Sequence, residues 1–317
     1  MTSKPPPRVR TLSAYFRETY GQRVHKVSVD GGFTCPNRDG NKGFGGCAFC
    51  DSSGSRAPYC APTSENIAAT LRVAMDRLCR RFKARKFLVY FQAFSGTYAP
   101  APTLRARYDA ALCDERIIGL SIATRSDCLS QEALDVVASY APRLQEIRLE
   151  FGLQTTNLAV LEQMGCGHSP DDFRQATLRA HQRGIKVCAH VIFGLPGDTA
   201  NHVLACAPLL NRLGVEGVKL HNLYVAQDSR LAARYREAPF PILDHDTYIE
   251  YVCRFLAALS PETVVERVAG DPPPGALAPT WRLDKRAQWT LIEAAMAKRG
   301  WRQGCLAGRE PQNDESH

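Results

Sequence analysis

Five short apolar runs follow one another along the chain and turn polar or glycine-rich at their C-terminal ends. A further stretch, RVHKVSVDGG at 23–32, precedes them and alternates more between apolar and polar positions. Near-continuous apolar runs are typical of parallel strands that are covered on both faces. The five runs are KFLVYFQAF (86–94), RIIGLSIATR (116–125), LQEIRLEFGLQT (144–155), IKVCAHVIFGLPG (185–197) and GVKLHNLYV (217–225). The pattern predicts six strands of one parallel sheet.

Helix-like segments separate the strands, and several open with a capping signal. Pro62–Glu65, Ser130 and Ser169–Asp172 place a hydroxyl or acidic residue where a helix is expected to begin. Alternating strands and helices form βαβ units, which makes this an α/β protein of six units. The predicted helices include 64–85, 102–114, 130–140, 170–183 and 200–213.

The alternation is lost after residue 225. We expect a helix at 245–259, a short strand at 263–268, a bend in the proline-rich GDPPPGALAP and a last helix at 283–299. The chain therefore divides into a basic N-terminal segment (1–19), a core (20–225), a small α+β C-terminal extension (226–304) and a polar tail (305–317) that we expect to be disordered.

Composition places the chain among ordinary water-soluble proteins. Hydrophobic residues make up 44% and charged residues 23%. No apolar run reaches the roughly 18 residues of a membrane span, and the basic, proline-rich N-terminus lacks the apolar core of a signal peptide. We therefore expect a cytoplasmic protein with no membrane partner. The formal net charge of +8 favours anionic partners.

Three cysteines, Cys35, Cys47 and Cys50, form the motif C-x11-C-x2-C directly after the first predicted strand. Thiolates hold four-iron clusters with one thiolate per iron, so three leave one iron open to a small ligand. The loop follows a strand and therefore lies at the C-terminal end of the sheet, where barrel enzymes carry out their chemistry. The spacing favours an iron–sulfur centre with one open corner.

A zinc site is the alternative from spacing alone. Cys60 lies ten residues after Cys50 and could complete a four-cysteine set, although zinc modules usually contain two C-x2-C pairs. The remaining cysteines are scattered singly, and most of them are expected to be small buried side chains. We expect Cys60 to be structural as well.

The motifs together resemble the radical S-adenosylmethionine (radical SAM) superfamily. An aromatic residue, Phe49, precedes the last cysteine of the motif. Within the superfamily the chain resembles the YhcC family, which is related in sequence to the radical SAM domain of the Elongator catalytic subunit. The blocks that carry this resemblance are GGFTCPNRDGNKGFGGCAFC, YFQAF, ATRSDC, LEFGLQT, KVCAHVIFGLPG and GVKLHNLY.

The resemblance implies a partial (βα)6 TIM-like barrel and two cofactors. A [4Fe-4S] cluster would be bound by Cys35, Cys47 and Cys50, and SAM would bind the open iron. Reductive cleavage of SAM would give a 5′-deoxyadenosyl radical that abstracts hydrogen from a substrate. The enzyme would need an electron donor such as flavodoxin or ferredoxin.

Candidate SAM-pocket residues lie in the loop or at the C-terminal ends of the strands. The resemblance singles out Arg125, Glu150 and Gln154, and it places VIFGLPG, with Gly194, against the adenine. The full set of expected cofactor-binding residues is Phe49, Gln92, Arg125, Glu150, Gln154, Gly194 and Lys219.

Two features depart from the pattern of the family. Ser126 stands where a proline is expected, and FQAFSGTY replaces the usual Gly-Gly-Glu after the second strand. Other readings also stay open for single residues. Glu150 and Arg148 could form a surface pair, and His168 and His221 could be satisfied core or rim histidines.

The stretch RLCRRFKARK at 77–86 contains six basic residues in ten. It suits either a solvated helix end, where cations are favoured, or contact with RNA phosphates. The resemblance to the Elongator subunit suggests tRNA as the substrate. The competing class of substrate is a small metabolite or a protein side chain.

Overall fold

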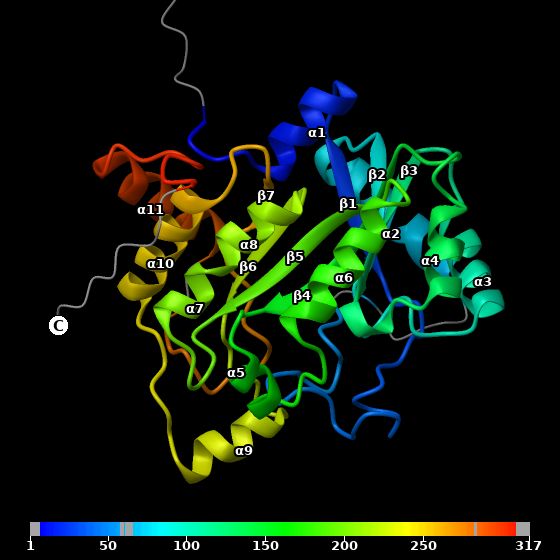
Figure 1. Ribbon diagram of the computed structural model, residues 1–317. Coiled ribbons are helices and arrows are strands. Elements are labelled where there is room, and N and C mark those ends of the chain that lie inside the picture. Colours follow the sequence, from blue (N-terminus) through cyan, green and yellow to red (C-terminus); the bar gives the residue numbers. More distant parts are fainter. Residues whose placement is uncertain (1–6, 58–59, 61–65, 282–283, 309–317) are drawn as a thin grey trace, which may run out of the picture.

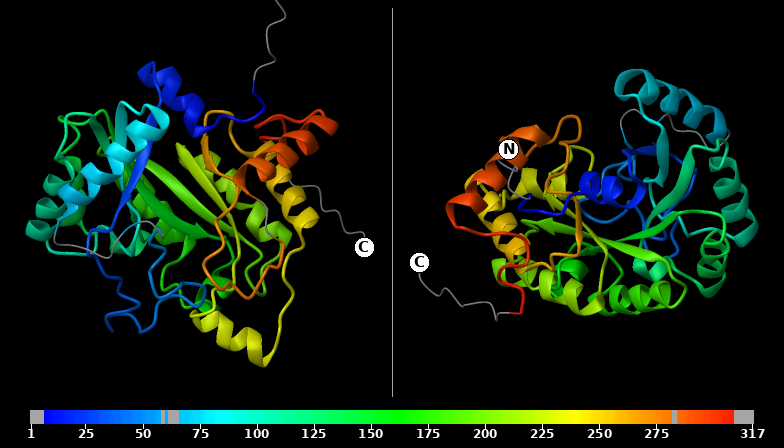
Figure 2. Two further views of the ribbon diagram at one scale, coloured as in Figure 1. Left: turned by 180° about the vertical axis from the view of Figure 1, so that it is seen from behind. Right: turned by 90° about the horizontal axis from the view of Figure 1, so that it is seen from above.

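The computed structural model describes residues 7–57, 60, 66–281 and 284–308. Seven strands form one sheet, in which each strand pairs in parallel with the next strand of the chain. The sheet curls into a half-barrel, which the view from above in Figure 2 shows. The strands are β1 (Val24–Val29), β2 (Lys86–Phe91), β3 (Ile117–Thr124), β4 (Glu146–Gln154), β5 (Lys186–Phe193), β6 (Gly217–Asn222) and β7 (Val264–Arg267). The α/β class and the partial TIM-like barrel are confirmed.

Helices cover the convex face of this sheet (Figure 1). They include α2 (Ile67–Phe82), α3 (Ala101–Ala111), α4 (Gln131–Ala138), α6 (Pro170–His181), α7 (Ala200–Leu204), α8 (Cys206–Leu213), α10 (His245–Ala258) and α11 (Lys285–Lys298). Helix α1 (Leu12–Tyr20) lies at the N-terminal ends of the strands, whereas α5 (Leu158–Gln163) and α9 (Arg230–Glu237) lie at their C-terminal ends. None of the described helices is long and apolar enough to cross a bilayer.

The helix caps in the structure agree with the predicted ones at those positions that the structure describes. Ser130 caps α4 with its side chain, and Ser169 forms a reciprocal capping box with Asp172 at the start of α6. The signal at 62–65 lies outside the described residues, and Asn66 caps α2. The helix expected at 200–213 is divided into α7 and α8.

The strand expected at 263–268 is observed as β7, and it joins the same sheet beyond β6. The sheet therefore has one strand more than the six βα units provide. The chain that precedes α1 runs beside β7, and the amide of Val265 donates to the carbonyl of Arg10 at 2.8 Å. Gln303, near the other end of the chain, donates to the carbonyl of Thr263 at 2.7 Å. Segments near both ends of the described chain thus pack beside the last strand.

Side chains alternate between the two faces of each strand, and the two faces differ in chemistry. The convex face of β4 carries Ile147, Leu149, Phe151 and Leu153, which are buried in the main hydrophobic core. The concave face, called the lumen below, carries Glu146, Arg148 and Glu150, each 1% exposed. The helices are thus held by apolar packing, while the lumen is polar.

Candidate functional site

The three cysteines of the motif lie in the loop between β1 and α2, at the C-terminal ends of the strands, called the mouth below (Figure 1). A tight turn holds the close pair, because the amide of Cys50 donates to the carbonyl of Cys47 at 3.0 Å. Gly46 has a φ of 86°, which favours glycine. The thiol of Cys47, burial and the charge of Cys35 together raise the pKa of Cys50 well above its usual range. The loop therefore brings the thiols of Cys47 and Cys50 together, and Cys35 lies near enough for its charge to act on Cys50.

Helix α5 and the turn that follows it hold one side of the cysteine loop. The amide of Ala48 donates to the carbonyl of Met164 at 2.8 Å. The side chain of Asn37 donates to the carbonyls of Gly165 and Cys166, at 2.7 and 3.1 Å, and to the sulfur of Cys47 at 3.4 Å. Asn37 therefore links the second cysteine of the motif to the α5 turn.

Helix α9, which belongs to the C-terminal extension, holds the other side of the loop. The amide of Leu231 donates to the carbonyl of Ala48 at 2.8 Å, and Arg230 donates to the carbonyl of Gly46 at the same distance. Just before the helix, Asp228 accepts from the amide of Ser52 at 2.9 Å. The contact between α9 and the cysteine loop was not predicted, because nothing in the spacing of the motif indicates this helix.

Two further cysteines differ in their relation to the motif. Cys166 is fully buried beside Cys47, and its thiol holds the pKa of Cys47 well below the usual range. Nothing in the spacing of the cysteines indicates this proximity. Cys60 instead donates to the carbonyl of Ser28 on β1 at 3.1 Å, and burial raises its pKa to about 11. This geometry favours a structural role for Cys60.

Several buried polar atoms at the mouth have no hydrogen-bond partner among the described residues. Arg125 donates to Asp127 at 2.9 and 2.8 Å but leaves Nη1 unpaired. His168 is 8% exposed, and its ring nitrogens have no partner at good hydrogen-bond geometry among the described residues. Oε1 of Gln154 is unpaired as well. Because buried unpaired groups are costly, these positions fit a ligand that carries carboxylate, amine and hydroxyl groups, as SAM does.

Arg125 and His168 also lie close to the cysteines. The pKa of His168 is lowered, first by burial and then by the charge of Arg125. Burial alone would raise the pKa of Asp127, but hydrogen bonds from Arg125 and from Lys42 of the cysteine loop hold it below its ordinary value. The loop and the end of β3 are thus tied by charged contacts.

Gln154 ends β4 in a conformation that L-residues rarely adopt, with a φ of 66°. Its side chain folds back over Gly152, where a Cβ would come within 2.4 Å of the Gln154 amide nitrogen. Non-glycine residues at positive φ often mark functional sites. This geometry supports the expected place of Gln154 in the pocket.

The other expected mouth residues are occupied by protein contacts. Gln92 accepts from Ser28 at 3.0 Å and donates to the carbonyl of Ser55 at 2.8 Å. Phe49 is half-buried in an apolar cluster with residues of α5 and α9. At Gly194, a Cβ would lie 3.1 Å from Leu243, so this glycine admits the chain that follows α9.

Glu150 and Lys219 lie deeper, inside the lumen. Glu150 contacts Lys219, Ser121 and, at 2.6 Å, Lys26. Arg148 does not pair with Glu150 on the surface. Instead it is 1% exposed and pairs at 2.5 Å with both Glu146 and Glu266. The surface-pair reading is therefore wrong, because both side chains point into a polar lumen.

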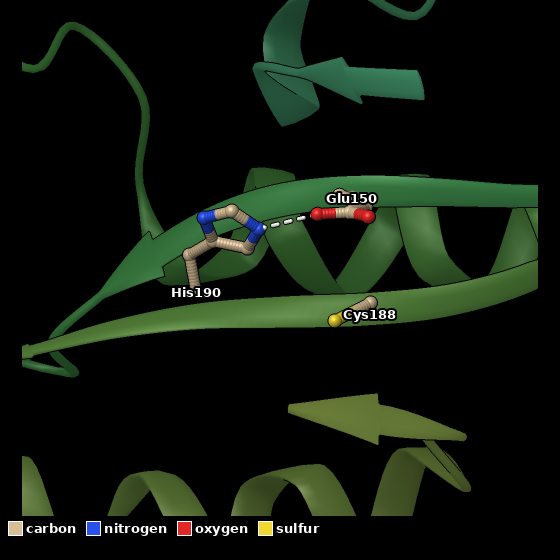
Figure 3. A group of neighbouring side chains, drawn as sticks. All are labelled: Glu150, Cys188 and His190. Atoms are coloured by element: carbon tan, nitrogen blue, oxygen red, sulfur yellow. Dashed lines mark hydrogen bonds and ion pairs between the residues drawn. The ribbon is translucent and has the colours of Figure 1, made fainter. Parts of the chain in front are cut away.

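A group of three possible metal ligands, Glu150, Cys188 and His190, lies within this network (Figure 3). Their ligand atoms lie within 4.8 Å of one another, and His190 Nε2 is 2.8 Å from Glu150. However, the Glu150 carboxylate already contacts Lys26 and Lys219. Two ammonium groups at one carboxylate repel a cation, so this group is a paired network and not a metal site.

The basic stretch 77–86 lies at the opposite end of the barrel from the mouth. It forms the end of α2 and the start of β2, where the strands begin. Arg77, Arg80, Arg81 and Lys83 are exposed there. At the mouth, three arginines of α9 are exposed: Arg230, Arg234 and Arg236.

The family model described as the radical SAM superfamily matches residues 35–209, and the model of the radical SAM C-terminal domain matches residues 215–298. The chain belongs to the radical SAM superfamily. It is therefore a radical SAM enzyme, and its cofactors are a [4Fe-4S] cluster and SAM. Enzymes of this class need a reductant.

The chain is also similar to several proteins over most of its length. It is 32% identical to YtqA of Bacillus subtilis (strain 168), covering 94% of this chain and 92% of that protein. It is 34% identical to YhcC of Escherichia coli (strain K12), covering 92% of each. The chain is also 25% identical to a tRNA uridine(34) acetyltransferase of Dehalococcoides mccartyi. That match covers 50% of this chain and 34% of the other protein.

Among solved structures, the chain resembles Elp3 of the archaeon Methanocaldococcus infernus. The TM-score is 0.66 with 18% sequence identity, and the match covers 89% of this chain and 65% of that one. This likeness shows that the two share a fold.

Proposed function

We propose that this enzyme cleaves SAM reductively at a [4Fe-4S] cluster held by Cys35, Cys47 and Cys50, and that the resulting 5′-deoxyadenosyl radical abstracts hydrogen from a substrate. The observation that carries the proposal is the position of Arg125, His168 and Gln154. They lie at the same mouth as the three thiols, with buried polar atoms that no described residue satisfies.

Each of these residues has a distinct part in holding SAM. The free Nη1 of Arg125 suits the SAM carboxylate, since guanidinium groups pair well with planar anions. His168 supplies a donor or an acceptor beside it. Gln154 Oε1 can accept from a ribose hydroxyl. The cluster, when bound, supplies the electron for cleavage, and flavodoxin or ferredoxin would deliver that electron.

The test is anaerobic incubation of the reconstituted protein with dithionite and SAM. We expect slow formation of 5′-deoxyadenosine and methionine without any added substrate. A Cys47→Ala variant prepared in parallel should form neither product. An intact, reduced cluster that leaves SAM uncleaved would contradict the proposed activity.

A tRNA is the substrate that the relatives favour. The similarity to proteins named as tRNA uridine(34) acetyltransferases supports it. The exposed arginines of α9 beside the cysteine loop give phosphate groups a place to bind near the mouth. The stretch 77–86 could add contacts, but an RNA that touches both surfaces must span at least one strand length, about 20 Å.

Binding of bulk tRNA at different salt concentrations tests this assignment. Several phosphate contacts should lower the affinity by orders of magnitude between about 50 and 200 mM salt. Charge reversal at Arg234 and Arg236 should weaken binding more than the same change at Arg80 and Arg81. If the wild type binds no tRNA even at low salt, the substrate is a small metabolite or a protein side chain.

A further inference from the structure

The three glutamates of the lumen are already neutralised by the cations around them. Each glutamate contacts at least two basic side chains at 4.0 Å or less, so none is free to compensate another charge. The pairs are Glu146 with Arg148 and Lys186, Glu150 with Lys26 and Lys219, and Glu266 with Lys26 and Arg148.

Arg267, the last residue of β7, is a cation beside the lumen that takes part in none of these pairs. It is half-buried beside Lys219, its register partner on β6. No ion pair or hydrogen bond holds its guanidinium within the described part of the chain. Its charge reaches the lumen, since it helps to lower the pKa of His190 after burial and the charge of Lys219. A partly desolvated guanidinium without a counter-charge is unfavourable until an anion arrives.

His221 lies next to this cation and has a free hydrogen-bonding position. Its ring stacks on His190, with centroids 5.4 Å apart and planes 29° apart. Nε2 is buried and unpaired among the described residues. Burial, and then the charge of Arg267, lowers the pKa of His221 well below its usual range, so the ring is neutral at pH 7. A neutral imidazole can still donate one hydrogen bond.

We propose that Arg267 and His221 bind an anionic group of the substrate, either a phosphate or a carboxylate. The inference rests on the proposed function, because it assigns the end of β7 to the substrate of that reaction. The guanidinium fork matches either anion in two hydrogen bonds, and His221 supplies another donor. SAM also has a carboxylate, but Arg125 Nη1 and the His168 ring lie nearer the cysteines and suit it, which leaves Arg267 and His221 for a second ligand.

Inorganic phosphate and acetate are suitable probes. Each is titrated by calorimetry into the anaerobic holoenzyme, saturated with SAM and kept oxidised so that SAM is not consumed. We expect the wild type to bind at least one of them, and the stronger of the two identifies phosphate or carboxylate as the substrate group. Arg267→Met should weaken binding at least tenfold, whereas Arg267→Lys should retain part of it. Arg299→Met is the matched control, because Arg299 pairs with Glu250 on the surface.

His221→Phe adds a variant that keeps a ring stacked on His190 and removes only the nitrogens. It should weaken binding of the same probe severalfold. The proposal is overturned if neither anion binds the wild type, or if Arg267→Met binds as tightly as the wild type. Cleavage of SAM by the same preparations reports on the proposed function separately. Failure of anion binding with normal SAM cleavage would count against this inference alone.

Discussion

The ammonium group of Lys26 on β1 lies 2.6 Å from the carboxylate of Glu266 on β7, although these are the two outermost strands of an open sheet. The same ammonium group lies 2.6 Å from Glu150 on β4. A closed barrel joins its first and last strands through backbone hydrogen bonds. This half-barrel joins them through a buried ion pair, which makes the closure sensitive to charge.

Glu266→Gln should therefore destabilise the protein by about 3 kcal/mol at pH 7. The substitution removes a buried negative charge that both Lys26 and Arg148 contact, and it leaves their positive charges incompletely compensated. Burial alone would raise the pKa of Glu266, but Lys26 and Arg148 lower it from 4.5 to about 2. The stabilisation is thus complete above pH 4.5 and is lost as the pH falls toward 2. Urea unfolding at several pH values should show the gap between wild type and variant closing over that interval.

The exposed pair of Glu262 with Arg10 provides the control, since the Glu262 side chain is 83% exposed. Glu262→Gln should change the stability by less than about 1 kcal/mol at any pH. Equal losses for both variants would show that burial of the Lys26 pair is not what stabilises the closure.

Replacement of Cys35, Cys47 or Cys50 by alanine should abolish the brown chromophore and the roughly four irons per chain expected for the wild type. Cys60→Ala should retain the iron, because Cys60 is hydrogen-bonded to β1. Cys166→Ala, directly beside Cys47, is the more demanding control and should also retain it. Iron analysis together with the visible spectrum measures both outcomes, and loss of iron in Cys60→Ala would reopen the four-cysteine alternative.

Gln154→Gly should change the stability of the protein and its affinity for SAM in opposite directions. Removing a side chain at a φ of 66° should stabilise the ligand-free protein by about 1 kcal/mol. Loss of the amide should weaken SAM binding by about tenfold. Lys83→Gly relieves a similar φ of 53° at the end of α2, far from the mouth, and should stabilise the protein without changing SAM affinity. Denaturant unfolding and equilibrium dialysis measure the two effects, and unchanged SAM affinity in Gln154→Gly would remove Gln154 from the pocket.

The contacts between α9 and the cysteine loop can be tested by measuring how fast a chelator removes iron from the protein. Asp228→Asn combined with Arg230→Ala weakens or removes the contacts to Ser52 and Gly46, and loss of iron should be about tenfold faster. Arg236→Ala, on the same helix, contacts Gln227 and not the loop, so it should leave the rate unchanged. If the double variant keeps its iron as long as the wild type, α9 does not support the centre.

The sequence was sufficient for the features that depend on local pattern. Apolar runs predicted the strands of the sheet, and Ser130 and Ser169 predicted the starts of two helices. It was not sufficient where side chains point into the lumen. A buried charge such as Arg148 looks like a surface charge in a sequence, because only the curvature of the sheet brings Glu266 to it. The same holds for Cys166, whose proximity to Cys47 depends on the turn after α5.

The contacts of α9 have a consequence for the order in which the protein matures. The cysteines occupy positions 35 to 50, whereas the helix that closes over their loop ends at residue 237. A nascent chain exposes the three thiols long before the ribosome has made the helix that shields them. The contacts that hold this loop are therefore complete only after synthesis of about three quarters of the chain, and until then the thiols depend on the reducing conditions around them.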